Sequence, residues 1–168
     1  MKLFLTVILL AVSPLSNAQS LWGKASVGMS VEDLRAAYPN AIEIDHEPTR
    51  RGGTSDYWQV NDVRIADEKF TASFYFREHR LDSVILRPQS REPHKMAAIA
   101  ETLRAALMQK YGQIAGQSQS KGEFIRGSRV SWITDGTTVS LETIEGSSGP
   151  ISLQVRYDSR ISNAASNL

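Results

Sequence analysis

The sequence predicts an α+β protein of two helices and about seven antiparallel strands, and three observations support this. One long segment, 94–111, repeats apolar residues at spacings of three and four, as an amphipathic helix does. Several shorter segments alternate apolar and polar residues, which is the pattern of half-buried strands. The chain has 168 residues, 41% of them hydrophobic, which is enough to bury one core.

The first predicted helix begins after Ser30, a residue type whose hydroxyl caps helix N-termini. Val31, Leu34 and Tyr38 follow at helical spacing and share a face. Pro39 and the asparagine after it then end the segment. Two acidic residues in the first turn favour the same start, because the N-terminal end of a helix dipole is positive.

Strands are expected on both sides of a polar loop at 46–56, which contains a Gly-Gly pair. The alternation is clearest in 70–76, where three phenylalanines and an alanine take every second position. A hairpin turn is expected at 77–80. The strands predicted for this half of the chain are 41–45, 57–65, 70–76 and 81–86.

The second helix is expected over 94–111, with Gly112 as its C-cap. A polar connection at 113–122 follows it. Three alternating segments then predict strands, with an Asp-Gly turn between the first two. These segments are Val130–Thr134, Val139–Thr143 and Ile151–Tyr157. Trp132 and Phe74 fit buried positions of the alternation and are expected in the core.

A weak internal repeat relates the two halves. Leu34 and Tyr38 precede the end of the first helix as Leu107 and Tyr111 precede Gly112, at an offset of 73 residues. A duplicated helix-plus-sheet unit accounts for this, although two aligned pairs also arise by chance. The sequence therefore leaves open a single α+β domain over 19–160 or two fused halves, at 19–90 and 91–160.

Residues 1–18 have the organisation of a secretory signal peptide. Lys2 gives a positive start, Leu3–Val12 is almost entirely apolar, and Ser16 and Ala18 stand at the −3 and −1 positions. The apolar run of about ten residues is half of the roughly 20 that span a bilayer. We expect cleavage after Ala18 and a periplasmic location, with full export as the alternative. At the other end, 161–168 is expected to be a frayed tail.

Composition excludes several kinds of protein. The chain has no cysteine, which excludes a disulfide scaffold, a zinc–thiolate site, a cysteine nucleophile and a lipid-carrying cysteine. Lys plus Arg number 19 against 18 for Asp plus Glu, a balance that argues against a nucleic-acid partner. No segment after the signal reaches transmembrane length. We therefore expect no lipid anchor, no membrane span and no nucleic acid.

Catalytic motifs are not evident in the sequence. No histidine pair has metal-ligand spacing, and neither a phosphate-binding glycine loop nor a serine elbow occurs. We expect no catalytic residue, metal site or cofactor, but two alternatives stay open. Carboxylates such as Glu142 and Glu145, or Asp67 and Glu68, would serve a cell-envelope hydrolase if they lie close enough in space. A cavity between helix 94–111 and the sheet would serve a small-ligand carrier.

Two segments have the residue types of a binding surface. Arg50 and Arg51 precede the Gly-Gly pair, with Tyr57 and Trp58 just beyond, and arginine and aromatic residues are enriched among interface anchors. We predict partner binding there. A secondary basic patch, suited to a carboxylate or phosphate group, comprises Arg87, Arg91, His94 and Lys95. A solvated basic surface without a partner is the alternative for both.

The segment from Val27 to Leu34, which contains Gly28-Met29-Ser30 and is closed by Tyr38-Pro39, resembles the opening of envelope proteins of the outer-membrane assembly accessory (SmpA/OmlA) type. It is similar also to the tandem units of the β-lactamase-inhibitory protein. The second half resembles such a unit without the Gly-Met-Ser opening. The chain lacks the lipid-carrying cysteine of the first family and the paired cysteines of the second. The resemblance implies a non-catalytic binding or inhibitory module that recognises another envelope protein through its sheet face and loops.

Overall fold

A computed structural model describes residues 19–44, 54–134 and 136–159, with only the backbone described at 54–57. The expected signal segment, Arg50, Arg51 and the expected tail at 161–168 lie outside the described residues. The elements of the first half are β1 (Ser20–Trp22), β2 (Ala25–Ser26), α1 (Val31–Ala37), β3 (Ile42–Glu43), β4 (Thr54–Ile65), β5 (Glu68–Arg77) and β6 (Arg80–Pro88). Those of the second half are α2 (Pro93–Tyr111), β7 (Gly116–Lys121), β8 (Arg126–Thr134), β9 (Thr137–Gly146) and β10 (Gly149–Ser159).

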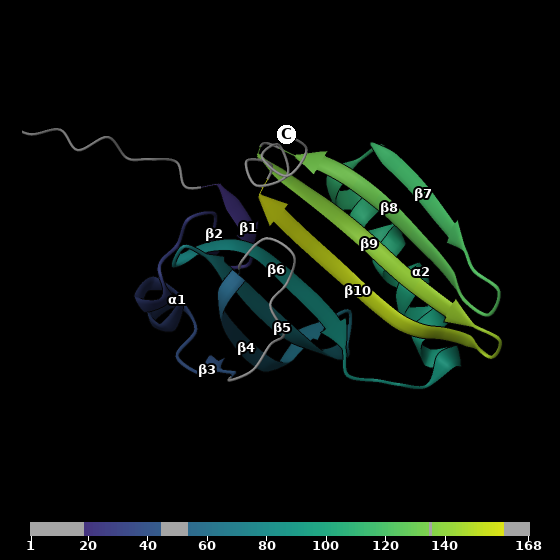
Figure 1. The fold of residues 1–168 in the computed structure, drawn as a ribbon, viewed down its shortest axis with the longest axis horizontal. Coiled ribbons are helices and arrows are strands. Elements are labelled where there is room, and N and C mark those ends of the chain that lie inside the picture. Colours follow the sequence, from purple (N-terminus) through teal and green to yellow (C-terminus); the bar gives the residue numbers. More distant parts are fainter. Residues whose placement is uncertain (1–18, 45–53, 135, 160–168) are drawn as a thin grey trace, which may run out of the picture.

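Eight of the described strands form one antiparallel sheet in the order β3-β4-β5-β6-β10-β9-β8-β7, while β1 and β2 pair separately. A helix followed by four strands of this sheet occurs twice, as α1 with β3 to β6 and as α2 with β7 to β10. The two sets meet where β6 pairs with β10 in the middle of the sheet (Figure 1). The α+β fold class is confirmed, and the two halves share one sheet.

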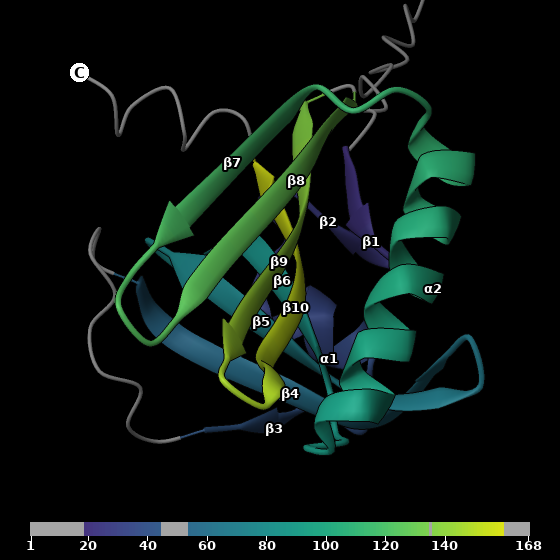
Figure 2. The same cartoon turned by 90° about the vertical axis from the view of Figure 1, so that its right-hand side faces the viewer.

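Both helices pack on the same face of the sheet, and Figure 2 shows α2 running along that face. Leu34 of α1 and Leu107 of α2 belong to one hydrophobic cluster, together with Phe74 and Trp132 of the sheet. Phe74 and Trp132 are fully buried, as expected from the alternation. Burial of this continuous apolar layer is the main favourable contribution to folding.

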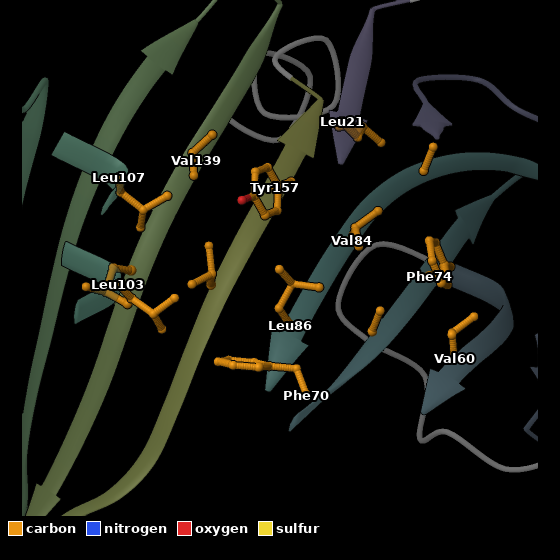
Figure 3. Packing of buried hydrophobic residues seen from close by; sticks show 14 of the residues in the cluster. Leu21, Val60, Phe70, Phe74, Val84, Leu86, Leu103, Leu107, Val139 and Tyr157 are labelled. Carbon is orange, nitrogen blue, oxygen red and sulfur yellow. The ribbon is translucent and has the colours of Figure 1, made fainter. Parts of the chain in front are cut away.

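The core continues across the junction of the two halves. Val84 of β6 pairs with Tyr157 of β10, and Leu86 of β6 pairs with Val155 of β10. Figure 3 shows Val84 and Leu86 beside Tyr157, with Leu107 of α2 beyond it. Because these residues come from both halves, the hydrophobic layer continues without a break across the β6–β10 junction.

The local signals at the helix ends act as predicted. Ser30 Oγ accepts a hydrogen bond from the Asp33 backbone N–H at 3.1 Å, and the Asp33 carboxylate accepts one from the Ser30 N–H at 3.4 Å. This reciprocal capping box satisfies two N–H groups at the start of α1. At the end of α2, Gly112 has a φ of 76° and donates its N–H to the Met108 carbonyl at 2.9 Å.

Three details of the secondary structure differ from the sequence-based expectation. The expected polar connection at 113–122 contains strand β7. All six residues of this strand are exposed and none is apolar, so its sequence shows no alternation of apolar and polar residues. The expected loop at 46–56 is wrong at its end, since β4 begins at Thr54. The short pair of β1 and β2 was not predicted, because two or three residues are too few to show a period of two.

An aromatic cluster holds the N-terminal segment against the sheet. Trp22 stacks on Tyr38 with ring centroids 6.2 Å apart, and Tyr38 lies 5.1 Å from Phe74. The Tyr38 hydroxyl accepts a hydrogen bond from the Lys24 N–H at 2.8 Å and donates one to the Trp22 carbonyl at 3.2 Å. Burial raises the pKa of Tyr38, and the hydrogen bonds from Lys24 and Ala25 offset part of that rise.

Candidate partner-binding face

The face of the sheet opposite the helices is polar in the second half of the chain. Val130, Leu141 and Val155 belong to the core, so their neighbours along β8, β9 and β10 point to the other face. Those neighbours include Arg129, Ser131, Ser140, Glu142, Gln154 and Arg156. Neither described helix covers this face, which we call the helix-free face (Figure 1). In the first half the same face also buries apolar side chains, since Tyr75 and Ile85 pack beside Ile44.

Four side chains of the helix-free face form a continuous chain of contacts across four neighbouring strands. Arg87 Nε on β6 donates to Gln154 Oε1 on β10 at 3.2 Å, and Gln154 Nε2 donates to Glu142 Oε2 on β9 at 2.6 Å. The other oxygen, Glu142 Oε1, pairs with Arg129 Nε on β8 at 2.9 Å. We call these four residues the polar belt. It has a guanidinium group at each end and a carboxylate between them.

The belt orients Arg129 and leaves it accessible. The Arg129 side chain is 57% exposed, whereas that of Glu142 is 18% exposed. A guanidinium has five N–H donors in a planar fork, and the pair with Glu142 engages the Nε end. Arg129 can therefore donate hydrogen bonds to a second carboxylate or to a carbonyl of a partner without leaving Glu142.

A second ion pair lies next to the belt on β10. Arg156 Nε donates to both carboxylate oxygens of Asp158, at 2.7 and 2.6 Å. Burial lowers the pKa of Arg156, but Asp158, Glu142 and Asp82 more than offset this, so that its pKa is raised. Arg156 is therefore held in place beside the belt, with its charge compensated by Asp158.

A shallow hollow of about 470 Å³ adjoins the belt and lies over β7, β8 and β9. Arg129 and Glu142 form part of its wall, together with Gly127 and Ser120. Ile144 lines the hollow and is 41% exposed. The surface therefore combines oriented charge with a small accessible apolar area, as interface cores do.

The structure separates the residues of the predicted partner-binding segment. Arg50 and Arg51 lie outside the described residues, and of Tyr57 only the backbone is described, paired with Tyr75. Trp58 lies in the hydrophobic core with 8% of its surface exposed, and the Arg35 guanidinium lies 5.7 Å from its ring centre. Trp58 stabilises the helix side of the sheet, so its ring is not presented to a partner.

The secondary basic patch is also divided. Arg87 belongs to the polar belt on the helix-free face. Arg91 and His94 are exposed near the start of α2. Lys95 pairs with Glu68 at 2.9 Å, and this hydrogen-bonded carboxylate raises the pKa of Lys95. Only Arg87 therefore contributes to the face that carries the belt.

The candidate carboxylates do not form a close pair. Glu142 and Glu145 are three residues apart on β9, so their side chains leave opposite faces of the strand. Glu68 is paired with Lys95, and Asp67 sits in the β4–β5 turn with a φ of 64°. Among the described residues, no group of three histidine, aspartate or glutamate side chains converges as an ion site.

A small hollow of about 130 Å³ lies between α2 and the sheet, where a ligand site was considered. Its walls include Phe70, Ile99 and Leu103 together with the Lys95–Glu68 pair. Small-molecule sites usually enclose roughly 300–1,000 Å³. This space is smaller than that, and so is a second hollow of about 230 Å³ between α2 and strands β8 to β10.

Sequence reasoning missed Gln154 and Arg129, and it considered Glu142 only as a catalytic carboxylate. A signal for them exists, because polar residues alternate with apolar ones in β9 and β10. That signal places them on one face of each strand. The contacts among these side chains depend on strand register, which places Arg129 of β8 opposite Glu142 of β9 and Glu142 opposite Gln154 of β10.

Comparisons with known families, with curated proteins and with solved structures found no match to this chain. In the described residues, neither helix is both long and apolar enough to cross a membrane.

Proposed function

We propose that this chain is a secreted, non-catalytic binding or inhibitory module that recognises another protein of the bacterial envelope. Cleavage after Ala18 would release it into the periplasm with 18 basic and 18 acidic residues. The observation that carries the proposal is the polar belt, which displays two oriented guanidinium groups on the helix-free face. Arginine is among the residues that most often dominate the energy of protein interfaces.

The mechanism follows from the rigidity of the surface. Arg129 and Glu142 stand on the paired strands β8 and β9, which are anchored by core residues on the other side. A partner therefore meets side chains that are already held in place, which lowers the entropy cost of binding. The partner surface that fits has carboxylates opposite Arg87 and Arg129 and an apolar group opposite Ile144. Bound there, the module would block whatever the partner does at that surface.

Affinity capture from a cross-linked envelope extract tests the proposal, using the chain from Gln19 to Leu168 as bait. The belt variant is Arg87→Ala with Arg129→Ala. Its matched control is Lys24→Ala with Arg64→Ala, which removes the same charge from exposed positions away from the belt. We expect one dominant partner that the control retains and that the belt variant binds at least about tenfold more weakly, given the weight of interface arginines.

Two results would contradict the proposal in different ways. If neither the unaltered chain nor the control enriches a partner, a binding module is not supported. If the belt variant retains full affinity while folded, binding does not use the belt. Arg50→Ala with Arg51→Ala tests the predicted loop separately, and a folded double variant with unchanged affinity would remove that loop from the interface.

A further inference from the structure

A polar hollow lies on the helix side of the sheet, at the β7–β8 hairpin. The register places Lys121 of β7, Arg126 of β8 and Glu145 of β9 in one row across three strands. Val130 of β8 belongs to the core, and Ser128 and Arg126, two and four positions before it, share its face of the strand. The row therefore lies on the helix side, and the hairpin carries it away from α2 (Figure 2).

The hollow is large enough for a small ligand. It measures about 480 Å³, within the range of roughly 300–1,000 Å³ for small-molecule sites, and its walls come from β7, β8 and β9. Besides the row, Gln119 and Ser128 line it. An adjoining hollow of about 390 Å³ shares the three residues of the row and adds Phe124 at the tip of the hairpin. Charged, neutral polar and aromatic groups therefore line two adjoining spaces.

Two cations of the row face each other. Lys121 and Arg126 are directly opposite, and the Cβ atoms of opposite residues are roughly 4.5–5.5 Å apart. Both residues are exposed, and within the described part of the chain neither side chain is engaged in a hydrogen bond or an ion pair. Like charges at opposite positions destabilise a sheet, whereas an anion placed between them compensates both charges and accepts hydrogen bonds from each.

We propose that this hollow binds an acidic saccharide, meaning a sugar that carries one carboxylate or phosphate group. The anionic group lies between Lys121 and Arg126, and the sugar hydroxyls reach Gln119, Ser128 and Glu145. This site goes beyond the proposed partner-binding function, because it lies on the helix side of the sheet whereas the polar belt lies on the helix-free face.

Glu145 restricts the chemistry of the rest of the ligand. A carboxylate accepts hydrogen bonds and does not donate them, so the ligand group opposite it must be a donor such as a hydroxyl. Its negative charge disfavours a second anionic group, which argues against a polyanion. Gln119 and Ser128 both donate and accept, which suits a ring of hydroxyls. A sugar with a single charge meets all these conditions, whereas an inorganic anion satisfies only the two cations.

Phe124 gives the site an apolar surface. It is 79% exposed, and the Gly122 N–H donates to the Ile125 carbonyl at 2.8 Å, which closes the hairpin that carries it. The C–H face of a sugar ring can pack against an aromatic ring and remove both from water. Binding of a saccharide therefore gives a use to the most exposed large apolar residue in the described part of the chain.

Amide NMR titration of the isotope-labelled chain from Gln19 to Leu168 tests the proposal. The probes are glucose and its two acidic forms, glucuronate and glucose 6-phosphate, which differ from it in carrying a carboxylate or a phosphate. We expect the acidic sugars to bind at least about tenfold more tightly than glucose, acetate or inorganic phosphate, because only they engage the cations and the polar groups together. The largest shifts should lie at Gln119, Lys121, Arg126 and Ser128. Tight binding of one acidic sugar alone would support the site and identify its charged group.

Lys121→Gln with Arg126→Gln removes both cations and keeps side chains that form hydrogen bonds. This variant should bind the acidic sugars at least about tenfold more weakly, with a smaller loss for glucose. The matched control is Lys24→Gln with Arg64→Gln, which removes the same charge at exposed positions of the first half and should bind as the unaltered chain does. Phe124→Ala should weaken binding of the sugars more than binding of acetate. Circular dichroism of each variant verifies that it is folded.

Several results would overturn the saccharide site. If neither acidic sugar binds, or if acetate and inorganic phosphate bind as tightly as the acidic sugars, the hollow does not recognise a saccharide. Equal binding of glucose would mean that the two cations take no part. A folded double glutamine variant with full affinity would place binding elsewhere. None of these results bears on capture of a protein partner through the polar belt, so the two proposals fail separately.

Discussion

Phe74→Ala should destabilise the fold far more than the same substitution at Phe124. Phe74 is fully buried, and its ring lies 5.1 Å from Tyr38 and 6.3 Å from Trp22. Removing a buried phenylalanine costs about 3–5 kcal/mol, and aromatic pairing accounts for roughly 0.5–1.5 kcal/mol per ring pair within that sum. A domain is typically stable by about 5–15 kcal/mol, so at least a fifth of the stability should be lost.

Urea unfolding followed by far-ultraviolet circular dichroism measures this effect. With a urea dependence of about 2 kcal/mol per molar, the midpoint should fall by roughly 1.5–2.5 M. Phe124→Ala is the matched control, because that side chain is 79% exposed, and its cost should stay within about 0.5 kcal/mol.

Phe74→Leu separates the two contributions, since leucine keeps most of the apolar volume and loses the ring contacts with Tyr38 and Trp22. Its cost should fall between those of the other two variants. The reasoning would be refuted if Phe74→Ala cost less than about 1 kcal/mol or if Phe124→Ala cost as much as Phe74→Ala.

Substitutions at four further positions test the caps, the core and the belt. Gly112→Ala should cost about 1–3 kcal/mol in urea unfolding, because a φ of 76° strains an alanine although its Cβ would have open space. Ser30→Ala should cost about 0.5–2 kcal/mol through the lost capping box, and Ser30→Thr should restore most of it. Burial beside Tyr111 raises the pKa of Tyr157, so the folded state keeps a proton that the unfolded chain releases near pH 10. The stability from this group is complete below about pH 10 and declines above it, and unfolding across alkaline pH should show a shallower decline in Tyr157→Phe. Arg129→Ala should change the free energy of unfolding by less than about 1 kcal/mol, because the Arg129 side chain is 57% exposed and Glu142 keeps its hydrogen bond from Gln154, and a larger loss would make the belt a structural element.

Elements with a strong local pattern could be predicted from the sequence. The helix over 94–111 was found within one residue of α2, because its apolar spacing and Gly112 are local signals. Phe74 and Trp132 were placed in the core because alternation alone assigns them to one face. The two repeated tyrosines lie at similar places in the fold, since Tyr38 is the C-cap of α1 and Tyr111 is the last residue of α2.

The candidate site depended on contacts that local patterns do not contain. Trp58 has the residue type of an interface anchor, yet pairing with Phe74 places it on the helix side of β4. Strand β7 has no apolar residue, so only its main-chain pairing with β8 makes it a strand.

The two helices, the alternating strands and the fold class can be predicted from the sequence, because periods and caps involve residues within a few positions of one another. The polar belt of Arg87, Arg129, Glu142 and Gln154 emerges only when the strands are paired. Up to 67 residues separate belt neighbours in the chain, and they meet because β6 pairs with β10 and β9 lies between β10 and β8. Strand order and register arise from how the whole apolar face is buried, which no short segment specifies.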